Sequence, residues 1–345
     1  MCLYFFFKES YAETNPSDRE PNKMKLATFR ANNRARLGGI IDDDKVIIDL
    51  AQIDRRLARR EKRKPNDFLT SMVELLEAGN KGLSTAKSLI KEAKKKRPQP
   101  DGKVGFNVNR VKLCAPVPNP KKIFCLAGNY QDHIEEGGSA KLSIQDKETP
   151  RIFMKPPTTT VIGPRDKILI PPVANSIDWE GELAVVIGRK CKGIKAADTL
   201  KYVAGYTIMN DVSERDLKIK KRTNSRPRDE WFDWLNGKWL DTFAPQGPWI
   251  VTRDEIPNPQ KLDISTFING ERKQHNNTGQ MLYPVKKIIE YISAIITLEP
   301  GDIISTGTIS GVGATTGTFM QPGDKVQVEI SGVGVLNNSV AASKK

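Results

Sequence analysis

The chain has 345 residues and carries 55 Lys and Arg against 41 Asp and Glu, which gives a net charge of +14 at pH 7. This length predicts one large domain or two ordinary ones, and a hydrophobic content of 38% is enough for a folded core. No run approaches the roughly 20 apolar residues that a membrane-spanning helix needs, so an integral membrane protein is not expected. Four cysteines without paired spacing argue against a disulfide scaffold or a zinc finger and favour a reduced, cytoplasmic protein.

Much of the positive charge lies in two tracts, residues 55–64 and residues 91–103. Neither tract contains aromatic side chains that could stack on nucleic-acid bases. We therefore predict solvent-exposed helix faces and a linker rather than a nucleic-acid site. A basic protein that binds a polyanion is the non-enzymatic alternative.

The first 50 residues divide into an extension and a strand-rich segment. Residues 1–23 end in a polar, proline-containing stretch without periodicity, which predicts a disordered extension. A strand-like segment follows at 25–30. Two apolar runs, 37–41 and 46–50, then flank three consecutive aspartates, a pattern typical of a hairpin.

Helical spacing follows the hairpin. Apolar residues recur at helical intervals over residues 67–78, and a second helix is predicted over residues 83–95. A basic, proline-containing stretch up to residue 100 then interrupts the pattern as a linker would. We expect residues 24–100 to form a small α+β domain and residues 101–345 to form a second, larger domain.

The larger domain is predicted to be rich in strands. Short β-branched runs separated by Gly and Pro turns lie at 123–126, 152–154, 167–170, 182–187, 203–209, 263–268, 302–306, 325–330 and 333–336. One long helix is expected over residues 285–296. Many short strands with few helices indicate a β-rich α+β fold rather than a doubly wound sheet.

Two glutamates, Glu180 and Glu182, begin the apolar run that continues to residue 187. Residues two apart on a strand share a face, so their carboxylates would repel unless a cation lay between them. Asp211 follows another apolar run. Solvated acids at a strand edge and a helix N-cap are the alternatives from these segments alone. Three oxygen ligands would suit Mg²⁺, Mn²⁺ or Ca²⁺ better than zinc.

The chain has two histidines, His133 and His275. His133 precedes Glu136 by three residues, which places both on one face of a helix. A carboxylate beside an imidazole orients the ring and raises its basicity, as a general base requires. A structural histidine is the alternative for His133. His275 lies among Gln and Asn residues and is interpreted as a polar loop residue.

Beyond these local patterns, residues 105–340 resemble the fumarylacetoacetate hydrolase family. The motifs occur in the family's order: GNY at 128–130 followed by His133 and Glu136, FMKP at 153–156, DWEGELAVVIG at 178–188, GYTIMNDVSERD at 205–216, Lys238 with DTFAP at 241–245, LEPGD at 298–302, and TGT at 306–308. Seven motifs in order make a specific match. They favour the functional interpretation of Glu180, Glu182 and Asp211 over the structural alternatives.

The resemblance implies mixed β-sheets rolled around a central barrel, with the active site at its mouth. It implies a homodimer and a Mg²⁺ cofactor, with Mn²⁺ or Ca²⁺ in its place as alternatives. The residues that match the family's functional positions are Glu180, Glu182 and Asp211 as metal ligands, His133, Glu136 and Lys238 as catalytic residues, and Arg215, Thr308, Tyr130 and Lys155 as substrate contacts.

The resemblance further implies a metal-dependent hydrolase that cleaves a C–C bond in a small 2,4-dioxo acid, such as an acylpyruvate or fumarylpyruvate, through a metal-bound enolate. Alternatives within the family are a lyase, decarboxylase, isomerase or dehydratase of a related 2-oxo acid: oxaloacetate, hydroxymuconate or a 2-oxo-3-deoxy sugar acid. Asn129, where fumarylacetoacetate hydrolase itself has Asp, resembles the shorter acylpyruvase-like branch. Residues 219–237 are either a surface insertion or a loop that sets specificity or contacts a second copy.

Overall fold

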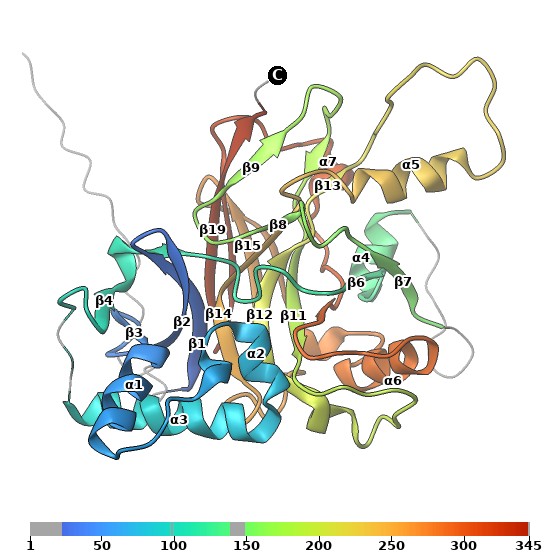
Figure 1. The fold of residues 1–345 in the computed structure, drawn as a ribbon. Helices are drawn as coiled ribbons and strands as arrows, with labels where there is room; N and C mark the ends of the chain where they lie inside the picture. The colour runs from blue at the N-terminus through green and yellow to red at the C-terminus, as the bar shows by residue number, and fades with distance from the viewer. Residues whose placement is uncertain (1–22, 97, 99, 139–148, 344–345) are drawn as a thin grey trace, which may run out of the picture.

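The computed structural model describes residues 23–96, 98, 100–138 and 149–343. Apart from residue 23, the predicted extension therefore lies outside the described residues. The described strands form a twelve-stranded sheet, a five-stranded sheet and a two-stranded ribbon (Figure 1). None of the described helices is long and apolar enough to cross a membrane.

The large sheet runs β4-β3-β2-β1-β14-β12-β11-β17-β6-β7, with β5 beside β1 and β8 beside β14. Its strands are β1 (Lys25–Ala31), β2 (Arg34–Ile41), β3 (Val46–Asp49), β4 (Gly105–Asn107), β5 (Lys112–Leu113), β6 (Ile123–Ala127), β7 (Arg151–Met154), β8 (Val161–Ile162), β11 (Gly181–Ile187), β12 (Val203–Asn210), β14 (Ala244–Thr252) and β17 (Ile303–Ser305).

The second sheet runs β16-β15-β18-β19-β9, and β10 pairs with β13 in the ribbon. Its strands and those of the ribbon are β9 (Lys167–Ile170), β15 (Asp263–Ile268), β16 (Glu271–Asn277), β18 (Lys325–Ile330), β19 (Gly334–Ala342), β10 (Ile177–Asp178) and β13 (Ser213–Glu214). The helices are α1 (Leu50–Arg60), α2 (Met72–Glu77), α3 (Gly79–Lys96), α4 (Gln131–Glu136), α5 (Asp229–Gly237), α6 (Val285–Ile295) and α7 (Gly313–Thr316).

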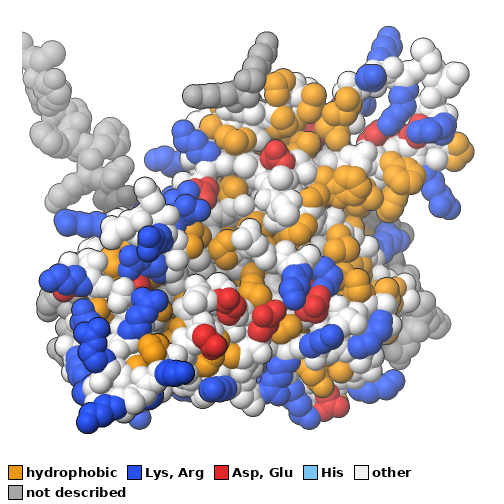
Figure 2. Space-filling model, viewed as in Figure 1, with side chains coloured by type: hydrophobic (Ala, Val, Ile, Leu, Met, Phe, Trp, Pro, Cys, Tyr) orange, Lys and Arg blue, Asp and Glu red, His pale blue; other side chains and the backbone are white. Residues whose placement is uncertain are grey.

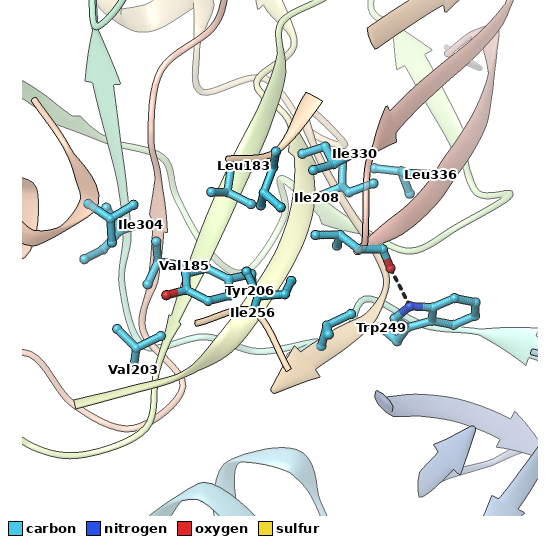
Figure 3. Packing of buried hydrophobic residues seen from close by; sticks show 14 of the residues in the cluster. Leu183, Val185, Val203, Tyr206, Ile208, Trp249, Ile256, Ile304, Ile330 and Leu336 are labelled. Atoms are coloured by element: carbon cyan, nitrogen blue, oxygen red, sulfur yellow. Dashed lines mark hydrogen bonds between the residues drawn. The ribbon is translucent and has the colours of Figure 1, made fainter. Parts of the chain in front are cut away.

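Strand β11 lies at the centre of the core and is buried along its whole length. Alternate side chains of a strand point to opposite faces. Leu183 and Val185 accordingly pack in one apolar cluster, together with Ile330 and Leu336 of the second sheet (Figure 3). Ala184 and Val186 belong to the other cluster, which includes residues of α2 and α3. Because an apolar cluster covers each face of β11, every residue of this strand after Glu182 is apolar.

The β-rich α+β fold predicted from the sequence is confirmed, and most predicted strands lie within a residue or two of their expected bounds. The strand path of the large sheet is open, since no pairing among the described residues joins β4 to β7. The expected rolling therefore takes the form of one long sheet packed against a shorter one, rather than a closed barrel.

The N-terminal part of the chain shares the large sheet with the rest. Strands β2 and β3 form the expected hairpin, and β1 pairs with β14 through Leu26 opposite Ile250. Helices α1 to α3 cover this part of the sheet (Figure 1). Lys and Arg side chains spread over the surface here, and those of the tract at residues 55–64 are exposed, as predicted (Figure 2). The boundary at residue 100 stays a prediction.

The single helix predicted over residues 67–78 was wrong. A 3₁₀ turn at Asp67–Leu69 is separated from α2 because Ser71 adopts an extended conformation and its side chain accepts a hydrogen bond from the Glu74 amide. Such an N-cap starts a new helix. Strand β14 was not predicted, since its two prolines interrupt the strand pattern, and α5 was also missed.

Gly205 allows the neighbouring strand β14 to approach β12, the strand that leads to Asp211, unusually closely. A Cβ atom at this position would lie 2.2 Å from the Val251 carbonyl oxygen. Because backbone must move to relieve that contact, we expect Gly205→Ala to lower the free energy of unfolding by about 1–3 kcal/mol. Urea unfolding of both proteins measures the change, and an unaltered midpoint would contradict the close packing.

Candidate active site

Three carboxylates meet at one end of the central strand pair. Glu180 precedes β11, Glu182 lies in it, and Asp211 directly follows β12. The antiparallel register pairs Gly181 with Asn210, and the Asp211 amide donates to the Glu180 carbonyl at 2.9 Å. One oxygen from each carboxylate lies within 4.8 Å of the others, and all three residues are buried. The strand geometry thus produces the juxtaposition that the sequence predicted.

Two lysines neutralise part of this negative charge. The Lys238 Nζ atom lies 2.7 Å from Glu180 Oε2 and 3.1 Å from Asp211 Oδ2. The Lys155 Nζ atom lies 2.5 Å from Asp211 Oδ1. Burial alone would lower the pKa of Lys238, but the carboxylates of Asp211 and Glu180 raise it above its ordinary value. These two carboxylates therefore favour the protonated, positively charged form of Lys238.

Glu182 is the carboxylate least compensated by protein groups. Burial, followed by the charges of Asp211 and Glu180, raises its pKa well above the ordinary value. Its Oε2 atom accepts hydrogen bonds from Ser305 Oγ and the Gly307 amide, whereas its buried Oε1 atom has no hydrogen-bond partner among the described residues.

An unpartnered carboxylate oxygen beside two further carboxylates is the arrangement that a hard divalent cation stabilises. Glu180, Glu182 and Asp211 therefore fit such a cation by their donor atoms and by their charge. Oxygen donors alone do not distinguish Mg²⁺ from Mn²⁺.

A cavity of about 400 Å³ opens beside the carboxylates. Glu180, Lys238, His133, Arg215 and Thr308 all line it. The remaining lining residues are Leu126, Ala127, Gly128, Ile134, Gly137, Thr149, Arg151, Phe153, Trp234, Tyr283, Val312, Ala314 and Thr315. Charged groups thus gather in a largely apolar chamber, where electrostatic interactions are stronger than in water.

The predicted pairing of His133 with Glu136 is present in α4. The His133 Nδ1 atom lies 2.7 Å from Glu136 Oε1. The other carboxylate oxygen of Glu136 accepts a hydrogen bond from the Gly311 amide at 2.8 Å. Glu136 therefore fixes the histidine ring and also ties α4 to the loop that follows β17. The Nε2 atom is the ring nitrogen left for a molecule in the cavity.

Arg215 is held by a residue whose role the sequence did not reveal. The Arg215 Nε atom donates to Asp178 Oδ2 at 2.8 Å, and an Nη atom lies 2.6 Å from Glu180 Oε1. Asp178 also accepts hydrogen bonds from the backbone amides of Gly313 and Ala314 at the start of α7. Asp178 thus orders one cavity wall. The sequence signals were its place two residues before Glu180 and at the start of the 178–188 motif, and neither indicated this contact.

The remaining predicted substrate contacts occupy different environments. Thr308 lines the cavity, and its hydroxyl donates to the Gly181 carbonyl at 3.2 Å. Tyr130 is wholly buried in the apolar core, and Lys155 is buried against Asp211. The structure brings Thr308 and Arg215 to the cavity with His133, whereas Tyr130 and Lys155 do not line it. The assigned roles of all four stay predictions.

The Asn129 side chain forms hydrogen bonds with backbone groups of two loops. Its amide group donates to the Thr306 carbonyl at 2.7 Å and to the Tyr283 carbonyl at 3.2 Å, while its oxygen accepts from the Tyr283 amide. A carboxylate could not donate to either carbonyl. The Asn at this position therefore joins two loops of the cavity wall rather than adding a fourth acid.

Helix α5 carries part of residues 219–237 into the site. Trp234 lines the cavity and packs edge-on against Phe153, with ring centroids 5.1 Å apart. The Lys238 Nζ atom lies 5.2 Å from the Phe153 ring and 5.7 Å from the Trp234 ring. The segment is therefore more than a surface insertion, because its helix supplies an aromatic wall beside Lys238.

Comparison with known proteins agrees with this architecture. The model of the fumarylacetoacetate (FAA) hydrolase C-terminal family matches residues 122–341. The oxaloacetate tautomerase YisK of Bacillus subtilis (strain 168) is 38% identical over 325 residues, which cover 92% of this chain and 100% of that protein. The mitochondrial oxaloacetate tautomerase Fahd2a of Rattus norvegicus is 39% identical over 272 residues, which cover 78% of this chain and 79% of that protein.

Solved structures show the same fold. Fumarylacetoacetate hydrolase from Exiguobacterium antarcticum aligns with a TM-score of 0.71 and 30% identity, covering 93% of this chain and 100% of that one. Maleylpyruvate hydrolase from Sphingobium sp. SYK-6, in complex with manganese(II) and pyruvate, aligns with a TM-score of 0.68 and 26% identity, with the same coverage of both chains.

Proposed function

Because the chain belongs to the fumarylacetoacetate hydrolase family, we propose that it is a divalent-metal-dependent tautomerase that interconverts the keto and enol forms of oxaloacetate. One observation carries the proposal: Glu180, one of three clustered buried carboxylates, lines the same cavity as His133 of the His–Glu pair, on a chain of which 92% matches an oxaloacetate tautomerase. The C–C hydrolase that the resemblance placed first thus becomes the second candidate.

The metal site is assigned to Glu180, Glu182 and Asp211. A divalent cation bound there supplies a Lewis acid that stabilises negative charge on the oxygen atoms of a 2-oxo acid. Lys238 adds a second positive charge at the same end of the cavity. Arg215, which is paired with Asp178 and Glu180, orients the Glu180 carboxylate.

Tautomerisation moves one proton between C3 and the 2-oxo oxygen. A base must therefore remove a proton from one atom, and its conjugate acid must return a proton to the other. His133 is the cavity residue suited to both steps, because Glu136 holds its ring through Nδ1 and leaves Nε2 available. The apolar walls formed by Phe153 and Trp234 limit access of water to the reacting carbon.

Hydrolysis of a 2,4-dioxo acid is the second candidate. The similarity to a maleylpyruvate hydrolase structure that contains manganese and pyruvate supports it. The same His133–Glu136 pair would then remove a proton from water instead of from C3. Decarboxylation of oxaloacetate shares the same enolate chemistry.

We also propose a homodimer and Mg²⁺ or Mn²⁺ as the cofactor. Exposed aromatic side chains on and after α5, namely Trp231, Phe232 and Trp239, support a contact surface for a second copy. Apolar side chains gather near α5 in Figure 2. A cytoplasmic location stays a prediction, and the relative Fahd2a carries "mitochondrial" in its name.

The test is a reaction panel with the purified full chain. The assay starts from the enol form of oxaloacetate, and its conversion to the keto form is followed by ultraviolet absorbance, once with Mg²⁺ and once with EDTA. Acetylpyruvate cleavage and CO₂ release from oxaloacetate are measured in parallel. We expect metal-dependent acceleration of enol–keto interconversion that exceeds any cleavage. Faster acetylpyruvate cleavage would overturn the tautomerase proposal in favour of the hydrolase, and CO₂ release as the dominant reaction would identify a decarboxylase.

A further inference from the structure

The charged side chains that line the cavity differ in whether they form ion pairs within the protein. Glu180 is paired with Lys238 and with Arg215, and His133 is paired with Glu136. Arg151 also lines the cavity, and none of the ion pairs formed among the described residues involves it. A molecule in the cavity therefore meets one guanidinium group whose charge is not already balanced by a described carboxylate.

The position of Arg151 follows from the sheet. It is the first residue of β7 and pairs with Ala127, the last residue of β6. Phe153 lies two residues further along β7, so both side chains share a face, and both line the cavity. Ile152, between them, packs against the opposite apolar cluster. The strand alternation therefore directs Arg151 toward the cavity by the same geometry that places Phe153 in its wall.

The chemistry of the chamber favours an anion beside Arg151. Arg151 is exposed, and the cavity that it lines is also lined by Leu126, Ile134 and Phe153. A guanidinium pairs with a carboxylate through two parallel hydrogen bonds, which makes arginine suited to bind a carboxylate group of a ligand. Arg151 begins β7, whereas Glu180 precedes β11 and Lys238 follows α5, and all three line the same cavity. One ligand in this cavity has Glu180 and Lys238 on one wall and Arg151 on another.

We propose that Arg151 binds the second carboxylate of a dicarboxylic 2-oxo acid and thereby selects dicarboxylates over monocarboxylates. The inference rests on the proposed function in one respect, namely that the 2-oxo acid end of the ligand lies at Glu180, Glu182 and Asp211. The inference adds that the other end of the ligand, its second carboxylate, lies at β7.

The test compares two ligands that differ only in the distal group. Oxaloacetate is pyruvate with one additional carboxylate on C3. Calorimetric titration with Mg²⁺ present measures both affinities for the wild-type chain, Arg151→Gln, Arg151→Lys and a control, Arg272→Gln. Arg272 is exposed on β16 and does not line the cavity. The change in the ratio of the two affinities isolates the interaction between residue 151 and the distal carboxylate.

We expect Arg151→Gln to weaken oxaloacetate binding by about 10- to 100-fold, the range for a hydrogen bond between charged groups. Pyruvate affinity should change no more than it does in Arg272→Gln, and Arg151→Lys should recover part of the oxaloacetate affinity. Equal weakening of both ligands, or no change in either, would overturn the role of Arg151.

The proposed function can fail separately. A wild-type chain that prefers oxaloacetate through Arg151 but accelerates no tautomerisation would retain the Arg151 assignment and reject the tautomerase. A wild-type chain that tautomerises oxaloacetate, with unaltered ligand preference in Arg151→Gln, would retain the tautomerase and reject the assignment.

Discussion

Replacing Glu182 by Gln is expected to remove metal-dependent activity without destabilising the metal-free chain. The substitution keeps the shape of a side chain whose pKa is raised by burial and by Asp211 and Glu180, but it removes a charged oxygen ligand. A metal ion that acts as a Lewis acid stabilises the transition state by several kcal/mol, so loss of the metal should lower kcat on the order of 10³-fold.

Thermal unfolding with and without Mg²⁺ separates binding from folding. A ligand that binds only the native state raises Tm, so Mg²⁺ should stabilise the wild-type chain and leave Glu182→Gln unaffected. Glu329→Gln, on β18 and outside the cavity lining, serves as the control and should keep the metal response. Full metal stabilisation of Glu182→Gln would contradict the assigned site.

His133→Asn is expected to give the second large effect. Loss of a positioned general base typically costs 10²- to 10⁴-fold, and we expect kcat to fall by about that factor. The Mg²⁺-dependent rise in Tm should remain, because His133 contacts Glu136 rather than the three carboxylates.

The chain supplies a matched control for this variant. His275 is the other histidine, and its Nδ1 atom lies 2.9 Å from Ser265 Oγ, outside the cavity lining. His275→Asn should keep wild-type kcat. Equal losses in the two variants, or wild-type activity in His133→Asn, would exclude His133 as the base.

The sequence predicted those parts of the site that follow from local geometry. Residues two apart on a strand share a face, which brought Glu180 and Glu182 together, and three-residue helical spacing joined His133 to Glu136. Asp211 required the family's motif order, because the register of β11 against β12 is a long-range property.

Other features could not be predicted because they depend on tertiary contacts. Asp178 joins Arg215 to the start of α7, which lies 135 residues after Asp178 in the chain. Trp234 lines the cavity, but the sequence of its segment does not indicate which of its three aromatic residues does so. Likewise, the hairpin of β2 and β3 could be predicted locally, whereas its continuation into β14 through β1 could not.

The most direct measurement is the anomalous scattering of Mn²⁺ in crystals of the full chain grown with oxalate, which carries two adjacent carboxylates as an analogue of the 2-oxo acid end. The account predicts one Mn²⁺ peak among the carboxylates of Glu180, Glu182 and Asp211, with oxalate on its cavity side. A Mn²⁺ ion bound elsewhere, or bound oxalate with no Mn²⁺ at these three residues, would contradict it.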